Sequence, residues 1–144
     1  MKKSSEVMTR DPICCLSTDT ASKAAQLMRV VDVGSIPVVE DEQTLKLVGI
    51  VTDRDLAIRV VADGRSANLT RVADVMSHEI ITCRANDDVQ KAVDAMSLHQ
   101  LRRIPVIDDD HRIVGIISQA DIATRVERSE EIAEMVKEIS QPTA

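Results

Sequence analysis

The sequence predicts an α+β (α/β) fold made of two βαββα repeats and a C-terminal helix. Three observations indicate this fold: a duplicated series of motifs, short apolar runs of strand length, and apolar residues at helical spacing between those runs. Each repeat is too small to bury its own apolar face, so we expect the two to pack together about a pseudo-twofold axis. The motifs of the first repeat are Val7-Met8, Ile36-Pro37-Val38, Val48-Gly49-Ile50 and Asp55, and those of the second are Val75-Met76, Ile104-Pro105-Val106, Val114-Gly115-Ile116 and Asp121.

The first repeat, residues 7–62, reads as strand, helix, strand, strand, helix. Residues 12–16 form an apolar run of strand length, followed by turn and cap residues. Proline cannot donate to a ladder, so we expect Pro37 at a strand start or an edge. The helix after residue 20 should bury one face that carries Ala24, Ala25, Leu27, Met28 and Val31. The expected elements are strand 12–16, helix 21–31, strands 35–39 and 47–52, and helix 53–61, which ends before Asp63-Gly64.

The second repeat, residues 75–128, follows the same order after a polar linker at residues 63–74. That linker ends in a short lead-in helix near residues 71–76. A C-terminal segment, residues 129–144, contains an amphipathic helix that either packs on its own body or joins a partner. The expected elements of the repeat are strand 80–83, helix 88–99 capped by Asn86 or Asp87, strands 103–107 and 112–118, and a helix from Gln119. The stripe of the C-terminal helix consists of Ile132, Met135, Val136 and Ile139.

Composition excludes several classes of function. The net charge of −6 and the absence of Phe, Tyr and Trp argue against nucleic acid as the main partner, because such binding relies on basic and aromatic side chains. No apolar run is long enough for a membrane span, and the first residues lack the apolar core of a secretion signal. The three cysteines, Cys14, Cys15 and Cys83, are most simply reduced thiols of a cytoplasmic protein.

A hydroxyl residue precedes an aspartate by three positions at the end of both repeats. Thr52 pairs in this way with Asp55, and Ser118 with Asp121. One interpretation is a helix capping box, which contributes about 1 kcal/mol. The other is a ligand site, because a helix start suits a phosphate and a carboxylate can accept hydrogen bonds from ribose hydroxyls. The spacing alone leaves both interpretations open.

These linked features resemble a tandem pair of CBS (cystathionine beta-synthase) domains, the Bateman module. The resemblance covers residues 7–126 and rests on the Val-Met start, the Ile-Pro-Val strand and the Gly-x-x-Thr/Ser-x-x-Asp turn, each present twice. Residues 52–57 and 99–106 look like those of small stand-alone bacterial CBS-pair proteins. The resemblance implies a regulatory sensor without catalytic activity that binds AMP, ADP, ATP or S-adenosylmethionine and acts on a separate partner.

The resemblance also implies where the ligands bind. The aspartate of each turn would hold ribose, the hydroxyl would help to hold phosphate, and aliphatic residues of the strands would enclose adenine. Basic residues before the strand of one repeat would reach the site of the other, and the first repeat has Gly34 and Ser35 there, so a phosphorylated adenosine should prefer the Asp55 site. The first site would comprise Thr52, Asp55, Arg102, Arg103, Ile36 and Ile13. The second would comprise Ser118, Asp121, Ile104 and Ile81.

Two other classes of protein remain as alternatives. An enzyme or a metal protein is disfavoured, because the chain has neither a nucleophile with a local base nor the usual spacing of zinc ligands. A dimeric scaffold with vestigial ligand sites is the stronger alternative. Its homodimer would form through the apolar faces of the helices, as CBS pairs commonly do, although core packing explains the same residues. The residues in question are Leu27, Met28, Val31, Ala92, Val93 and Met96.

Overall fold

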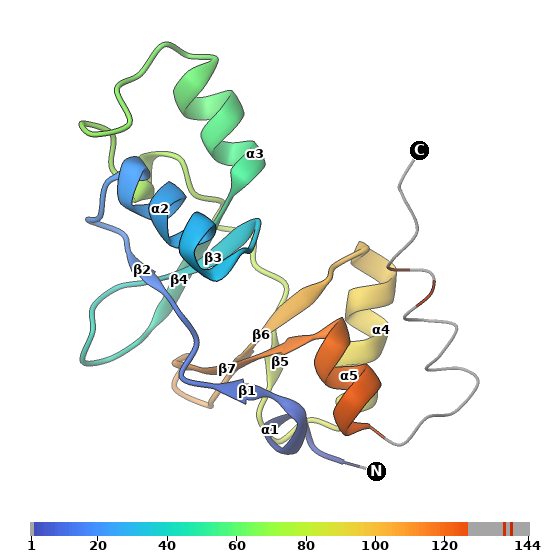
Figure 1. Ribbon diagram of the computed structural model, residues 1–144. Coiled ribbons are helices and arrows are strands. Elements are labelled where there is room, and N and C mark those ends of the chain that lie inside the picture. The colour runs from blue at the N-terminus through green and yellow to red at the C-terminus, as the bar shows by residue number, and fades with distance from the viewer. Residues whose placement is uncertain (1, 127–136, 138, 140–144) are drawn as a thin grey trace. The chain divides into compact units, whose positions relative to one another are not determined.

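The computed structural model describes residues 2–126, 137 and 139, which form two compact units (Figure 1). The first-repeat unit is Ile13–Ile80, and the second-repeat unit combines Met1–Pro12 with Ile81–Ala144. Both units contain a sheet and helices, which confirms the predicted α+β class. The segment that precedes each repeat along the chain therefore folds with the other repeat.

The first-repeat unit is built on a three-stranded sheet of order β2-β3-β4. Strand β2 runs parallel to β3, and β3 runs antiparallel to β4. The predicted helix and the two longer strands have the bounds that the sequence indicated, whereas the first strand is shorter than predicted and the last helix continues as a π-helix. The elements are β2 (Cys15–Leu16), α2 (Ala21–Val31), β3 (Ser35–Val39), β4 (Leu47–Thr52), α3 (Asp53–Leu56), the π-helix η1 (Ala57–Val61) and the 3-10 helix η2 (Val72–Asp74).

The second-repeat unit is built on a four-stranded sheet of order β1-β7-β6-β5, in which the first strand comes from the N-terminal segment. One predicted cap is wrong, since Asp88 caps α4 by accepting a hydrogen bond from the Gln90 amide. The elements are α1 (Ser4–Val7), β1 (Thr9–Arg10), β5 (Cys83–Arg84), α4 (Val89–His99), β6 (Arg103–Ile107), β7 (Ile113–Ser118) and α5 (Gln119–Arg125). The predicted helix at residues 129–140 lies outside the described residues, except for Lys137 and Ile139.

The position predicted for Pro37 is wrong, because it is the third residue of β3, the central strand of its sheet. Ile50, its partner on β4, exchanges backbone hydrogen bonds with Ser77 and not with β3. The Pro37 nitrogen therefore faces β2, whose pairing begins only at Val38. A central strand tolerates this proline because no partner strand needs a donor there.

Each unit has its own core. In α2 the buried residues are Ala21, Ala24 and Met28, whereas Ala25, which was predicted on the buried face, is exposed. The buried cluster of the first-repeat unit consists of Cys15, Ala21, Ala24, Met28, Ile36, Val38, Val51, Val60, Val72, Val75 and Met76. The cluster of the second-repeat unit consists of Val7, Met8, Cys83, Val89, Ala92, Val93, Met96, Ile104, Val106, Ile117, Ile122 and Ile139.

The glycine of each repeat lies beside an exchanged segment, that is, a segment that precedes one repeat and pairs with a strand of the other unit: residues 7–10 along β7, and residues 75–77 along β4. A Cβ atom on Gly49 would lie 3.0 Å from the Ser77 carbonyl oxygen, and one on Gly115 would lie 2.9 Å from that of Thr9. The methionine before each of these carbonyls is nearer still. The repeated glycine therefore permits the close approach of the exchanged segment.

Candidate ligand site

Both hydroxyl-aspartate pairs form complete capping boxes. The Asp55 amide donates to Thr52 Oγ1 at 3.0 Å, and the Thr52 amide donates to Asp55 Oδ2 at 2.9 Å. The Asp121 amide donates to Ser118 Oγ at 3.1 Å, and the Ser118 amide donates to Asp121 Oδ2 at 2.9 Å. The capping interpretation is thus confirmed in both units. Each box uses one acceptor position of the hydroxyl and one of the carboxylate, and an ionised carboxylate has about four such positions, so each aspartate can accept further hydrogen bonds.

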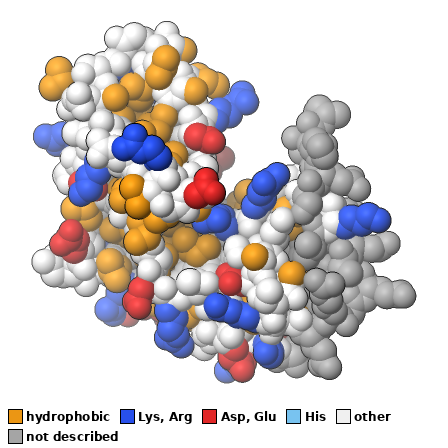
Figure 2. Space-filling view, in the orientation of Figure 1, with side chains coloured by type: hydrophobic (Ala, Val, Ile, Leu, Met, Phe, Trp, Pro, Cys, Tyr) orange, Lys and Arg blue, Asp and Glu red, His pale blue; other side chains and the backbone are white. Residues whose placement is uncertain are grey.

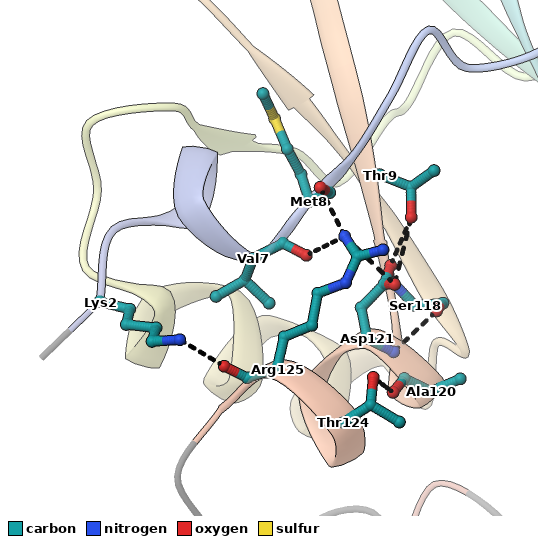
Figure 3. Close-up of polar contacts among 9 residues, drawn as sticks. All are labelled: Lys2, Val7, Met8, Thr9, Ser118, Ala120, Asp121, Thr124 and Arg125. Atoms are coloured by element: carbon teal, nitrogen blue, oxygen red, sulfur yellow. Dashed lines mark hydrogen bonds and ion pairs between the residues drawn. The ribbon is translucent and has the colours of Figure 1, made fainter.

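The two aspartates differ in the use of their second carboxylate oxygen. Asp121 is only 8% exposed, and its Oδ1 accepts a hydrogen bond from Thr9 Oγ1 at 3.1 Å (Figure 3). Asp55 is partly exposed, and within residues 2–126 its Oδ1 accepts no hydrogen bond and has no ion pair. Asp55 is thus more exposed than Asp121 and accepts fewer hydrogen bonds within residues 2–126.

Two arginines that sequence reasoning missed hold the exchanged segments in place. Arg125 Nη1 donates to the carbonyls of Val7 and Met8 at 3.1 and 2.9 Å (Figure 3). Arg59 Nη1 makes the equivalent bonds in the other unit, to the carbonyls of residues 75 and 76 at 3.2 and 3.4 Å. Each arginine follows the aspartate of its repeat by four positions, and this repetition is the signal that could have revealed them.

The aliphatic residues predicted for the sites differ in exposure. Ile36 and Ile104 are 1% and 0% exposed and belong to the two cores. Ile13 is 48% exposed, and Ile81 is partly exposed. Ile13 and Ile81 are therefore the members of the predicted sets that present apolar surface to solvent.

Arg102 and Arg103 belong to the second-repeat unit, whereas Asp55 belongs to the first-repeat unit. Their contribution to an Asp55 site therefore stays a prediction. Within its own unit, Arg103 lies opposite Ser118 in the β6–β7 ladder, so both side chains emerge on the same face of the sheet. The Arg102 carbonyl accepts a hydrogen bond from the Gln119 amide at 2.9 Å.

At the equivalent place in the first-repeat unit, the Gly34 carbonyl accepts from the Asp53 amide at 2.9 Å. The start of α3 also carries two carboxylates, Asp53 and Asp55, with Arg54 between them. A phosphate bound there would meet negative charge unless further cations approached it.

The three cysteines are unbridged thiols. Burial raises the pKa of Cys14 and of Cys83 from 9.0 to about 11 and that of Cys15 to about 12. Within the described part of the chain, no three His, Cys, Asp or Glu side chains are grouped so that they could hold a metal ion. Among the same residues, no helix has the length and apolar character needed to cross a membrane.

A model of the CBS domain family matches the chain twice, over residues 5–62 and 72–128. The chain therefore belongs to the CBS domain family and carries two copies of the domain, which confirms the resemblance seen in the sequence.

Several known proteins are similar to this chain in sequence or in structure over most of its length. Hypoxic response protein 1 of Mycobacterium tuberculosis is 35% identical over 144 residues, which is all of this chain and 98% of that protein. The crystal structure of Hypoxic Response Protein I with two coordinated zinc ions matches with a TM-score of 0.77 and 33% identity, covering 88% of this chain and all of that one. A CBS domain pair in complex with 5′-methylthioadenosine and S-adenosyl-L-methionine matches with a TM-score of 0.70 and 26% identity, covering 85% and 94% of the two chains.

Proposed function

We propose that this protein is a regulatory module that binds an adenosyl ligand, has no catalytic activity and acts on a separate partner in the cytoplasm. The carrying observation is Asp55, which is partly exposed, is held in orientation by Thr52 and has one carboxylate oxygen without a hydrogen bond from residues 2–126. A ribose diol can donate to such a carboxylate. The related CBS pair that binds 5′-methylthioadenosine and S-adenosyl-L-methionine supports the proposal, because both ligands carry an adenosine.

The charges near Asp55 bear on which adenosyl ligand it takes. With Asp53 and Asp55 at the start of α3, AMP, ADP or ATP needs additional cations, and we propose Arg102 and Arg103 for this role. A hydrogen bond from arginine to phosphate is charge-assisted and contributes roughly 1.5–3 kcal/mol. S-adenosylmethionine bears a cationic sulfonium and needs no such help. Replacing both arginines with glutamine should therefore weaken AMP binding by at least the roughly ten- to a hundredfold expected for one arginine and leave S-adenosylmethionine binding unchanged.

The same arginines could instead contact a ligand at the Ser118 site of their own unit, because Arg103 lies opposite Ser118. To distinguish the two sites, the two arginine substitutions are combined with Asp55→Asn in one variant and with Asp121→Asn in another, and AMP affinity is measured for each. If the arginines serve the Asp55 site, their removal weakens binding only where Asp55 is intact. Loss of affinity that instead requires an intact Asp121 would assign them to the Ser118 site.

We propose that the chain has no catalytic activity because its three cysteine thiols are poor nucleophiles. A raised pKa leaves a cysteine protonated at neutral pH, and the thiol is a far weaker nucleophile than the thiolate. Cys14, Cys15 and Cys83 all have raised pKa values because of burial. Their unbridged state is also the reason for proposing the reducing cytoplasm.

The alternative function is a homodimeric scaffold with vestigial sites, and exposed apolar residues on equivalent helices favour it. Val30 near the end of α2 is 76% exposed, and Leu98 near the end of α4 is 78% exposed. Figure 2 shows further hydrophobic side chains on the surface of the first-repeat unit. In that unit Val61 and Leu69 are 76% and 86% exposed. A homodimer through these helices is compatible with both functions, so ligand binding is the property that separates them.

A ligand screen on the purified chain tests the proposal. The chain has no Trp, Tyr or Phe and barely absorbs at 280 nm, so a co-purified purine would appear as a clear peak near 260 nm. We expect AMP, ATP or S-adenosylmethionine to raise the midpoint of thermal unfolding, since a ligand that binds only the folded state stabilises it. An empty spectrum together with no thermal shift from any of the three would favour the scaffold.

A further inference from the structure

The buried clusters of the two units largely correspond, position by position. Met96 in the second-repeat cluster, for example, takes the place of Met28 in the first. Some members of the second-repeat cluster, however, have no counterpart among the buried residues of the first. They are Val93 on α4, Ile122 on α5 and Ile139 in the C-terminal segment.

The helices of the second-repeat unit are covered at positions where those of the first-repeat unit are open. Val93 is 2% exposed, whereas Ala25 at the same position of α2 is exposed. Ile122 is 0% exposed, whereas Leu56 at the same position of α3 is partly exposed. The covered part of the second-repeat unit is called the α4–α5 surface below and comprises Val93, Ile122 and Ala123.

The residue types on these helices fit the same difference. Ala123 on α5 is partly buried, whereas Ala57 at the same position of the first repeat is exposed, so side-chain size does not explain the contrast. One turn further along α4 than Val93, Ser97 is partly buried where α2 has the exposed Arg29. A charged side chain is rarely buried without a partner, whereas small and apolar ones are buried readily. The second repeat thus carries residues suited to a covered surface, and the first repeat does not.

Ile139 is the described residue that can account for this cover. It is 4% exposed and belongs to the second-repeat cluster, whereas Lys137 in the same segment is exposed. Helical spacing places these two residues on opposite sides of the predicted C-terminal helix, with Ile139 on its apolar stripe. Helix α1 also contacts α4 and α5, but its Val7 and the equivalent Val75 are both 0% exposed, so that contact is common to the two units.

We propose that the α4–α5 surface is a docking surface whose occupant is the C-terminal segment of the same chain, with Ile139 as its anchor. Because that occupant is already in place, the surface is closed to a second copy of the chain and to a separate partner. The equivalent surface of the first-repeat unit, at Ala25 and Ala57, stays open. A partner that binds through the helices therefore meets two different surfaces in the two repeats. This inference does not depend on ligand binding.

Thiol labelling of the full chain with N-ethylmaleimide tests this inference, with the labelled peptides identified by mass spectrometry. One cysteine is introduced at the covered surface, by Val93→Cys, and one at the open counterpart, by Ala25→Cys. We expect the thiol at position 93 to react at least about tenfold more slowly than that at position 25, because reactivity follows exposure. Adding Ile139→Ser should remove most of this difference, and Ile139→Ala part of it. Lys137→Ser, at an exposed position of the same segment, should leave it unchanged.

Cys83 serves as an internal control for unfolding, because it is buried in the same cluster as Ile139. We expect both substitutions of Ile139 to speed labelling at position 93 without speeding it at Cys83. Equal acceleration at Cys83 in both variants would make Ile139 a core residue without a covering role, and would contradict the proposal.

Three other outcomes would overturn the proposal. A thiol at position 93 that reacts as fast as the one at position 25 would show that the α4–α5 surface is open. Protection that survives Ile139→Ser would assign the cover to another segment of the chain. Protection that rises with protein concentration would make a second copy of the chain the occupant.

Discussion

Replacing Gly115 with alanine should displace the exchanged N-terminal segment. The added methyl group would meet Met8 Sδ at 2.5 Å, Met8 Cγ at 2.7 Å and the Thr9 carbonyl oxygen at 2.9 Å. The methionine side chain can rotate away, but the carbonyl belongs to the β1–β7 ladder and moves only with the strand. The substitution therefore tests whether the glycine is present for this close approach.

The expected cost follows from two opposing effects. Overpacking of this kind costs about 1–3 kcal/mol, because neighbouring atoms must shift. Replacing a strand glycine with alanine by itself raises the free energy of unfolding by about 0.5–1 kcal/mol, since alanine loses less backbone freedom on folding. We expect Gly115→Ala to lower the free energy of unfolding by about 1–2 kcal/mol.

Urea unfolding followed by circular dichroism at 222 nm measures this change, since the chain has no aromatic side chains for fluorescence. Gly34→Ala is the matched control. The three atoms nearest to its methyl group would all belong to the carboxylate of exposed Asp53, the closest at 3.0 Å, and this side chain can move aside. If Gly115→Ala lowers stability no more than Gly34→Ala does, the close-approach explanation of the repeated glycine is wrong.

Two further predictions concern the arginines and the thiols. Arg125→Gln should lower the free energy of unfolding by about 1–2 kcal/mol, allowing for the 46% exposure of its side chain, and Arg59→Gln by less, because its bonds are longer. Equal losses in urea unfolding would contradict this ranking. With its pKa raised to about 11, Cys83 should react with iodoacetamide at pH 8 about a hundredfold more slowly in the folded chain than in urea. Because the pKa is raised on folding, the folded chain keeps the Cys83 proton at a pH where the unfolded chain has lost it. The contribution of this thiol to the free energy of unfolding is therefore fully present below pH 9 and is lost between pH 9 and 11. A free energy of unfolding that stays constant over this range would refute the shift.

The elements with strong periodicity were predictable from the sequence. Helix α2 and strands β3 and β4 have the predicted bounds because apolar spacing and turn residues define them locally. Pro37 was placed wrongly because its tolerance depends on where β2 begins to pair, which is a tertiary fact. The exchange of the segments before each repeat was also missed, since periodicity does not report which sheet a strand joins.

The site was predictable only in part for the same reason. The spacing of Thr52 and Asp55 specified the capping box, because a capping box is a local structure. The contact between Thr9 and Asp121 spans 112 positions, and no local pattern encodes it. Comparing the repeats position by position would have shown Arg59 and Arg125 at the same offset, and Ser77 in place of Thr9.

Binding of an adenosyl ligand at Asp55 is the property on which the proposed function depends. Calorimetric titration of Asp55→Asn and Asp121→Asn with AMP and with S-adenosylmethionine measures it directly. Asparagine keeps the size of the side chain in each capping box while removing the carboxylate. We expect Asp55→Asn to abolish binding of the ligand that the wild type takes and Asp121→Asn to leave its affinity within about twofold, a difference of about 0.4 kcal/mol. Retained affinity in Asp55→Asn with loss in Asp121→Asn would contradict the assignment of the site.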